Sequence, residues 1–175
     1  MRNRLFCLVV ASLVLFTGCS QKESNSYLLL FYDDPKEQYG YKDTTGKIII
    51  PPGKYDYCYT DTFRTYAIVV SQDTGLIAID RQEKRLYEVY SFDNGPDEVS
   101  EGFFRIVENE KIGFADAATG KIIISPQFHC AFPFENGHAK VSTDCRVKSA
   151  GEHKEWVSSK WFYIDKTGKR ISDTN

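Results

Sequence analysis

The sequence lacks the excess of positive charge that marks most nucleic-acid-binding proteins. Lysine and arginine number 22, aspartate and glutamate number 24, and the formal net charge is −2. The basic residues are scattered along the chain and form no stripe, so nothing in the charge distribution favours a nucleic-acid partner. We therefore expect no binding to nucleic acid.

Histidine is scarce, and the chain shows none of the spacings typical of metal sites. The few candidate ligands are His129, His138, His153, Cys130 and Cys145. No pair of them has the short separation of a zinc ligand pair. We also find no nucleophile with a neighbouring base and no carboxylate pair, and the sequence predicts a non-enzymatic protein without a metal or cofactor.

The main acidic stretch, Asp93 to Glu98, lacks the spacing of a calcium-binding loop. It contains Gly95 and Pro96, which interrupt regular structure. We interpret it as a solvated, turn-rich loop.

A helical pattern is absent from Ser26 onward, where no window keeps apolar residues at helical spacing for three turns. Hydrophobic residues nevertheless make up 42% of the chain and aromatic residues 14%, ample for a packed core. We expect one all-β domain over residues 26–175.

No apolar run approaches the roughly 20 residues that a membrane-spanning helix needs. The run from Leu5 to Phe16 is shorter, and Arg2 and Arg4 precede it. This arrangement is typical of a secretory signal peptide, which we place at residues 1–18. The alternative is a short anchor that stays attached.

The segment Thr17-Gly18-Cys19-Ser20 resembles the cleavage site of bacterial lipoproteins. The resemblance implies removal of the preceding residues and a diacylglycerol on the Cys19 thiol. Several acyl chains anchor stably, because each buried methylene contributes about 0.8 kcal/mol. Ser20 in place of aspartate implies the outer membrane, on its periplasmic or its surface face. Residues 19–25 would be a polar tether.

Four similar segments follow one another in the rest of the chain. Their reference aspartates are Asp43, Asp80, Asp116 and Asp165, at steps of 37, 36 and 49 residues. Near-constant spacing predicts a repeat architecture. We place the units near residues 39–70, 76–107, 112–143 and 160–172, with an insertion at 145–159.

Turn chemistry inside the units predicts β-hairpins. Asp43, Asp116 and Asp165 can accept backbone N–H groups in an Asx turn. The glycines that follow would supply the positive φ of a hairpin loop, and they are Gly46, Gly120 and Gly168. The second unit has no such glycine and is the least certain hairpin. Pro51 and Pro126 are expected to end the apolar strands that follow the turns.

The units resemble the WG repeat, in which a Trp-Gly pair precedes a Y-x-D-x-x-G-K turn, an apolar strand and a later F-x-x-G-x-A-x-V. The first and third units, "YGYKDTTGKIIIPP" and "IGFADAATGKIIISP", carry most of this pattern, although no unit keeps both Trp and Gly. The resemblance implies a β-rich binding or structural scaffold and carries over no catalytic residue.

A single hairpin is marginally stable, so neighbouring units must share a core. We expect an elongated antiparallel, solenoid-like array, with "SYLLLFY" from Ser26 covering one end. A barrel or propeller-like closure is the alternative.

Cysteine pairing is open at this point. With Cys19 lipidated, an oxidising compartment allows a disulfide between Cys130 and Cys145, which is the simpler pair, or between Cys58 and Cys130, which fall at nearly equivalent places in non-consecutive units. The alternative is that Cys58, Cys130 and Cys145 are all reduced.

Aromatic residues supply the candidate contacts. Tyr55, Tyr57 and Tyr59 alternate, and on a strand they would share one face. Trp156 lies in the insertion, in what we interpret as an exposed extension of the last hairpin. Packing between repeats is the alternative role for the tyrosines.

The functional hypothesis is a lipid-anchored, non-enzymatic β-repeat protein of the outer membrane that presents a surface to a protein partner. The alternative is a glycan-binding lipoprotein that uses the exposed tyrosine row.

Overall fold

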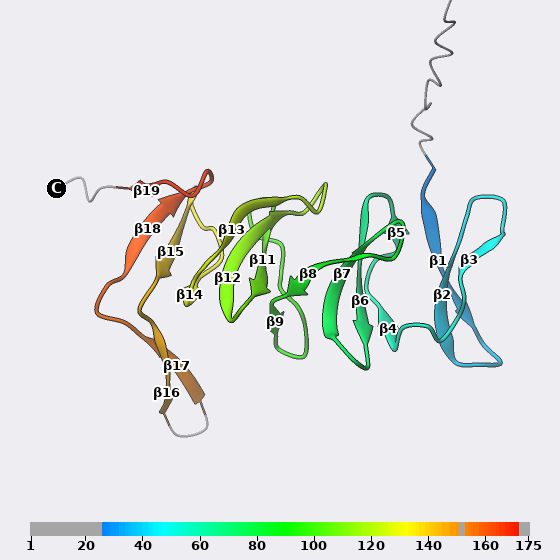
Figure 1. Ribbon diagram of the computed structural model, residues 1–175, viewed down its shortest axis with the longest axis horizontal. Helices are drawn as coiled ribbons and strands as arrows, with labels where there is room; N and C mark the ends of the chain where they lie inside the picture. Colours follow the sequence, from blue (N-terminus) through cyan, green and yellow to red (C-terminus); the bar gives the residue numbers. More distant parts are fainter. Residues whose placement is uncertain (1–25, 151–152, 172–175) are drawn as a thin grey trace, which may run out of the picture.

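The computed structural model describes residues 26–150 and 153–171, and every regular element in these residues is a β-strand (Figure 1). The main strands form four three-stranded antiparallel meanders, here called modules 1 to 4. The modules stand in chain order along the long axis of the molecule (Figure 1). The all-β fold and the elongated array are thereby confirmed.

Within each module the three strands pair in chain order. They are β1 (Leu28–Asp33), β2 (Gln38–Lys42) and β3 (Ile48–Ile50); β6 (Tyr66–Ser71), β7 (Gly75–Asp80) and β8 (Arg85–Val89); β11 (Phe103–Glu108), β12 (Lys111–Asp116) and β13 (Ile122–Phe128); and β15 (His138–Ser142), β18 (Phe162–Asp165) and β19 (Arg170–Ile171).

Seven further strands of the described residues connect the modules or extend from them. They are β4 (Tyr57–Cys58), β5 (Thr62–Phe63), β9 (Ser91–Phe92), β10 (Gly95–Pro96), β14 (Cys130–Ala131), β16 (Arg146–Ala150) and β17 (His153–Val157). Strand β4 pairs with β6 and β14 pairs with β15, so each leads into the next module. Strands β16 and β17 form a separate hairpin inside the insertion.

The modules group the strands differently from the sequence units. The first strand of each later module comes from the end of the preceding unit, as β6 does before it pairs with β7. The segment expected to cover one end of the array forms β1, which pairs with β2. It is thus the regular first strand of module 1.

The turn between the second and third strands is built in the same way in every module. The Asp43 Oδ1 atom accepts the backbone N–H groups of Thr45 at 2.9 Å and Lys47 at 3.0 Å. Asp165 does the same for Thr167 and Lys169, and the longer turn of module 3 uses Asp116 and Thr119. The glycines in these turns have positive φ, with Gly46 at 89°, Gly120 at 71° and Gly168 at 83°.

Module 2 forms this turn without a glycine. Asp80 accepts the N–H groups of Gln82 and Lys84, both at 2.9 Å. Glu83 takes the left-handed position with φ 62°. The Asx hydrogen bonds therefore hold a side chain where the other modules have glycine.

A second glycine in modules 1 and 3 marks a close approach of two backbones. A Cβ atom on Gly113 would lie 2.6 Å from the Pro126 nitrogen, and one on Gly40 would lie 2.8 Å from the Ile50 carbonyl oxygen. In both modules the third strand lies at a sheet edge, where proline is tolerated. In module 2, β8 pairs on both sides, with β7 and β11, and this position is Ile77.

The prediction that Pro126 ends its strand was wrong. Strand β13 continues to Phe128, with register shifts in its pairing to β12. Because β13 is an edge strand, it has a neighbouring strand on one side only. The missing N–H of Pro126 therefore leaves no second neighbour without a hydrogen bond. Strand β3, in contrast, ends at Ile50, just before Pro51.

The hydrophobic core lies between the modules, in three clusters. The first packs Tyr41 of module 1 against Val69 and Ile79 of module 2. The second joins modules 2 and 3, and the third joins modules 3 and 4 around Phe114 and Phe134. Each module thus buries its apolar side chains only with a neighbour, as expected of a repeat array.

Candidate binding groove

An open groove of about 890 Å³ lies at the junction of modules 3 and 4. We call it the aromatic groove because five aromatic rings line it. Its lining residues are Tyr90, Phe92, Asp97, Glu98, Arg105, Phe132, Pro133, Lys140, Val147, Glu155, Trp156 and Trp161. They come from segments that are far apart in the sequence.

A buried ion pair forms part of the groove wall. The Arg105 Nε atom donates to Asp97 Oδ2 at 2.9 Å, a second guanidinium N–H donates to Asp97 Oδ1, and a third donates to the Ala131 carbonyl at 2.9 Å. The guanidinium lies 4.2 Å from the centroid of the Tyr90 ring. Three residues, Asp97, Ala131 and Tyr90, thus fix the Arg105 guanidinium in the groove wall.

This ion pair corrects the interpretation of the acidic stretch. Asp97 was expected in a solvated loop, but its residue is only 7% exposed. The stretch also forms the hairpin of β9 and β10. Burial of one carboxylate is possible because Arg105, itself buried in β11, neutralises it.

The opposite wall comes from the inserted hairpin of β16 and β17. The Trp156 ring packs edge-on against Phe132 at 5.3 Å and against Tyr90 at 6.2 Å between centroids. It is half-buried against the third core cluster, so the expectation of a solvent-exposed extension was wrong for Trp156. Its neighbour across the hairpin, Val147, is exposed and also lines the groove.

Two features fix the base of this hairpin. A disulfide joins Cys130 of β14 to Cys145, the residue before β16. The Asp144 carboxylate accepts hydroxyl hydrogen bonds from Ser158, Ser142 and Ser159, which hold its pKa below the usual 3.8. Both features act where the hairpin leaves module 4, and so they position Trp156.

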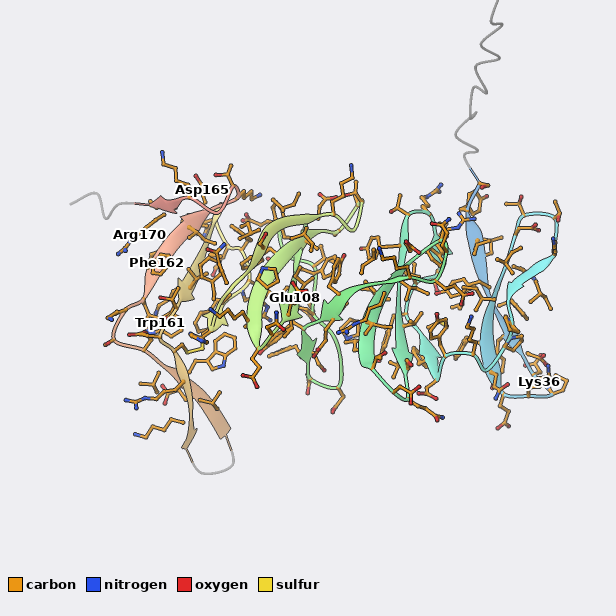
Figure 2. All side chains as sticks on the ribbon, in the orientation of Figure 1. Lys36, Glu108, Trp161, Phe162, Asp165 and Arg170 are labelled. Atoms are coloured by element: carbon orange, nitrogen blue, oxygen red, sulfur yellow. A yellow bond between two sulfur atoms is a disulfide. The ribbon has the colours of Figure 1, made fainter. Side chains whose placement is uncertain are left out.

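A lysine lies beside two of the groove's rings. The Lys140 ammonium lies 5.0 Å from the Trp161 centroid and 5.9 Å from the Phe132 centroid. Trp161 lies where the inserted hairpin returns to module 4 (Figure 2). Lys140 therefore places a positive charge among ring faces that remain partly open to solvent.

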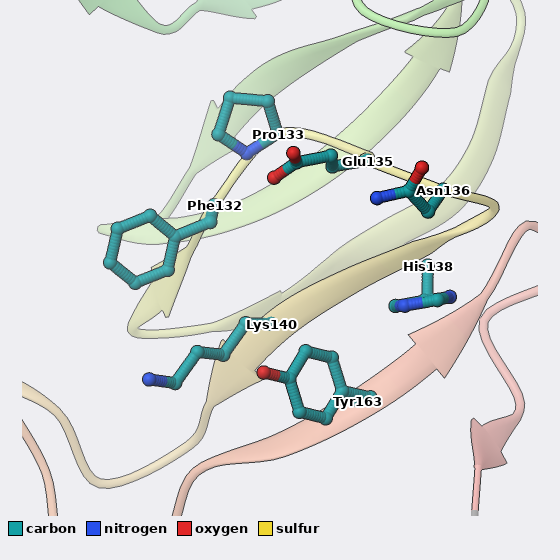
Figure 3. A pocket seen from close by; sticks show the side chains of 7 residues that line it. All are labelled: Phe132, Pro133, Glu135, Asn136, His138, Lys140 and Tyr163. Carbon is teal, nitrogen blue, oxygen red and sulfur yellow. The ribbon is translucent and has the colours of Figure 1, made fainter.

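A smaller polar pocket of about 430 Å³ lies beside the groove and shares Phe132, Pro133 and Lys140 with it. Its other lining residues are Glu135, Asn136, His138 and Tyr163 (Figure 3). The His138 ring packs edge-on against Tyr163 with 5.6 Å between centroids. The pocket offers hydrogen-bonding groups next to the ring faces of the groove.

The tyrosine row of the first repeat differs from the prediction. Tyr57 and Tyr59 are 42% and 39% exposed, with ring centroids 4.7 Å apart. Tyr55 departs from this row, and its hydroxyl donates to Glu83 of module 2. The row continues instead to Tyr39 and Tyr32, through centroid distances of 5.1 and 5.0 Å. We call Tyr32, Tyr39, Tyr57 and Tyr59 the tyrosine cluster.

The remaining candidate residues from the sequence are the possible metal ligands and the cysteines. Among residues 26–150 and 153–171, no group of three or more His, Cys, Asp or Glu is arranged to hold a metal ion. Burial raises the pKa of the Cys58 thiol to about 11, so Cys58 is protonated at neutral pH. Cys19 and the rest of residues 1–25 lie outside the described part of the chain, which contains no helix fit to cross a membrane.

Most of the groove was missed by reasoning from the sequence. Arg105, a charged residue inside the apolar strand "FFRIVE", was the available signal for a buried ion pair. Phe132 and Trp161 gave no signal, because they meet only when β14, β15 and the insertion come together.

A family model described as "WG containing repeat" matches residues 39–62 and 112–144. The matched segments begin at or beside the second strands of modules 1 and 3 and include their turns. No curated protein and no solved structure matched the chain.

Proposed function

Taking as the premise that this chain contains WG repeats, we propose that it is a non-enzymatic, lipid-anchored protein of the bacterial envelope that binds carbohydrate in its aromatic groove. The observation that carries the proposal is the grouping of Phe132, Trp156 and Trp161 around one open groove with a polar rim. Such rings offer flat apolar plates with hydrogen-bonding edges.

The dimensions and chemistry of the groove suit a sugar chain. Its volume falls within the range of about 300–1,000 Å³ that small-molecule sites occupy. The apolar C–H face of a pyranose can stack on an exposed ring such as Phe132, which is 41% exposed. Hydroxyl groups of the sugar would meet Glu98, Glu155 and Lys140 at the rim.

The charged side chains of the groove support binding over catalysis. Arg105 and Asp97 are committed to each other, Lys140 is placed over aromatic rings, and the two remaining carboxylates, Glu98 and Glu155, are exposed to solvent. Catalysis by proton transfer needs an acid and a base that both reach a reacting atom. The buried, protonated Cys58 is not a nucleophile in this arrangement.

The anchor in this proposal is a diacylglycerol on Cys19. Its support is the segment Thr17-Gly18-Cys19 after an apolar run, and Ser20 favours the outer membrane. The described residues begin at Ser26, which leaves a short polar tether between the lipid and module 1.

The groove is tested by co-sedimentation of the full chain, in mild detergent, with insoluble neutral polysaccharides. We expect the protein to pellet with at least one of them, and Phe132→Ala to lower the bound fraction about tenfold. Ile123→Ala, at a residue of β13 with 44% exposure that does not line the groove, is the matched control and should bind normally. Equal binding by the two variants would place the contact elsewhere.

The anchor is tested by metabolic labelling with a fatty acid in a bacterial host. The wild-type chain should incorporate label and sediment with membranes, and Cys19→Ser should do neither. Label retained by Cys19→Ser would refute the proposed lipidation site.

A protein partner is the second candidate, and the exposed isoleucines of two edge strands favour it. Ile48 and Ile49 are 53% and 41% exposed in β3, and Ile122 and Ile123 are each 44% exposed in β13. Exposed β-branched residues at an unpaired edge can accept a strand from another chain. If this candidate holds, a protein recovered with the chain from membranes should be lost when Ile48 and Ile122 are changed to lysine.

A further inference from the structure

An aromatic residue occupies the same position at each junction between modules. The residues are Tyr59, Tyr90 and Phe132. Their backbone N–H groups donate to the carbonyl oxygens of Ile68 at 2.9 Å, Arg105 at 3.1 Å and Lys140 at 2.9 Å.

These three acceptors are equivalent positions of the repeat. In each of these modules, one residue of the first strand pairs with the turn aspartate. These pairs are Tyr66 with Asp80, Phe103 with Asp116 and His138 with Asp165. The acceptor residue follows the first member of its pair by two positions in every case. The repeat therefore places one ring at each of its three junctions, so that the rings follow one another along the array.

Two of the three junction rings are well exposed, and the half-buried third ring, Tyr90, lies in the groove wall. Tyr59 is 39% exposed and Phe132 is 41% exposed, and Tyr90 lines the aromatic groove.

The tyrosine cluster and the aromatic groove meet near the β9–β10 hairpin. The Tyr59 hydroxyl lies 4.0 Å from the position of a Cβ atom on Gly95. Gly95 pairs with Phe92, which lines the groove. Strands β4, β9 and the β16–β17 hairpin also lie toward one long edge of the array, the lower edge in Figure 1.

We propose that the tyrosine cluster and the aromatic groove form one continuous binding track for an extended, uncharged carbohydrate polymer, with one junction ring for each module interface. The inference rests on the proposed function and deepens it, because it names a long chain as the ligand. A polymer presents the same group at regular intervals, which matches a ring repeated at each junction.

The charges along the track favour a neutral chain. Lys36 pairs with Asp33 beside the tyrosine cluster at 3.6 Å, and Arg105 pairs with Asp97 in the groove. The remaining groove charges, Glu98, Glu155 and Lys140, have both signs. These residues carry no excess of positive charge, so they offer nothing to attract a polyanion.

The N-terminus of the described residues lies at the opposite long edge, with the Asx turns (Figure 1). A lipid tether attached there would leave the track directed away from the anchor. The full anchored chain can therefore be used in the test.

The test is isothermal titration of the full chain, in mild detergent, with neutral β-linked glucose and N-acetylglucosamine oligosaccharides of increasing length. In the wild type, the longest soluble oligomer should bind at least about tenfold more tightly than the shortest that binds, because added contacts act intramolecularly. Tyr59→Ala should keep the affinity for the short oligomer within about twofold and lose most of the gain with length. Tyr57→Ala is an independent second variant, and Ile48→Ala is the control that should match the wild type.

The outcomes separate the track from the proposed function. A gain with length that survives both tyrosine changes overturns the track and leaves binding in the groove intact. Affinity without any dependence on length does the same. No binding of any carbohydrate by the wild type overturns both, and tight binding of a proline-rich peptide in its place would identify the aromatic surface as a peptide site.

Discussion

At the scale of single residues, the turn aspartates stabilise the folded state only while their carboxyl groups are ionised. The Thr119 hydroxyl and N–H hold the pKa of Asp116 below its usual 3.8, and Thr45 and Thr167 do the same for Asp43 and Asp165. A carboxylate whose pKa is lower in the folded state stabilises that state above its unfolded pKa. The stabilisation is lost as the pH falls through the folded pKa.

We therefore predict that the free energy of unfolding declines below about pH 4. Changing Asp43, Asp116 and Asp165 together to asparagine keeps an acceptor oxygen in each turn but removes the charge. Urea unfolding between neutral and acidic pH should show a shallower decline for this variant than for the wild type. Identical declines would mean that other carboxylates control acid stability.

Gly113 is required because the backbone of β13 lies too close to it to leave room for a side chain. Gly113→Ala would force a Cβ atom to within 2.6 Å of the Pro126 nitrogen, and backbone cannot move aside cheaply. We expect a loss of about 1–3 kcal/mol in the free energy of unfolding. Gly95→Ala is the matched control, because its nearest neighbour would be 4.0 Å away, and it should change stability by less than about 0.5 kcal/mol. Equal effects would refute the close approach as the reason for glycine.

The residue scale is also where the sequence was most informative. Aspartate and glycine at fixed offsets predict the Asx turns, since the interactions are local. Glu83 in the left-handed region could not be predicted, because the neighbouring hydrogen bonds to Asp80 impose it. The burial of Asp97 depends on Arg105, which lies eight residues away in β11.

At the scale of elements, the inserted hairpin is held to the array mainly at its base. Strands β16 and β17 pair only with each other, and the Cys130–Cys145 disulfide joins the hairpin to β14. The sequence left this pairing open. The length of the hairpin and the return of Trp156 toward Tyr90 were beyond local patterns, because both depend on contacts between modules 3 and 4.

Reduction should therefore loosen one wall of the groove. The disulfide closes a loop with a sequence separation of 15 residues, for which the chain-entropy model gives about 3 kcal/mol of stabilisation. We expect a reductant to lower stability by this order and to shift tryptophan emission to longer wavelength as Trp156 becomes hydrated. The double variant Cys130→Ser/Cys145→Ser should not respond to reductant. A wild type that also fails to respond would contradict the role of the disulfide.

At the scale of the whole molecule, the shared cores make each module depend on its neighbours. Modules 2 and 3 also share a seven-stranded sheet, because β8 pairs with β11. Spacing of the aspartates predicts such an array, since repeats need common cores. The same spacing could not predict the groove, whose residues run from Tyr90 to Trp161 and meet only after the modules stack.

Phe104→Ala in the middle cluster tests this dependence. Phe104 is 2% exposed and packs against Tyr66 and Tyr87, so its truncation should cost about 3–5 kcal/mol. Unfolding is followed by two probes. Circular dichroism reports on all modules, whereas tryptophan fluorescence reports on the C-terminal part of the chain, where both tryptophans lie. Coincident transitions by the two probes are expected in the wild type and the variant. Separate transitions would show that the modules unfold independently.

The most direct test of the central claim is intrinsic tryptophan fluorescence of the full chain during titration with neutral oligosaccharides. The sequence contains two tryptophans, Trp156 and Trp161, and both line the aromatic groove. We predict a saturable change in emission, with protection from collisional quenching, that Phe132→Ala abolishes or weakens about tenfold. Emission and quenching that stay unchanged while an oligosaccharide is shown to bind by calorimetry would contradict the assignment of this groove as the site.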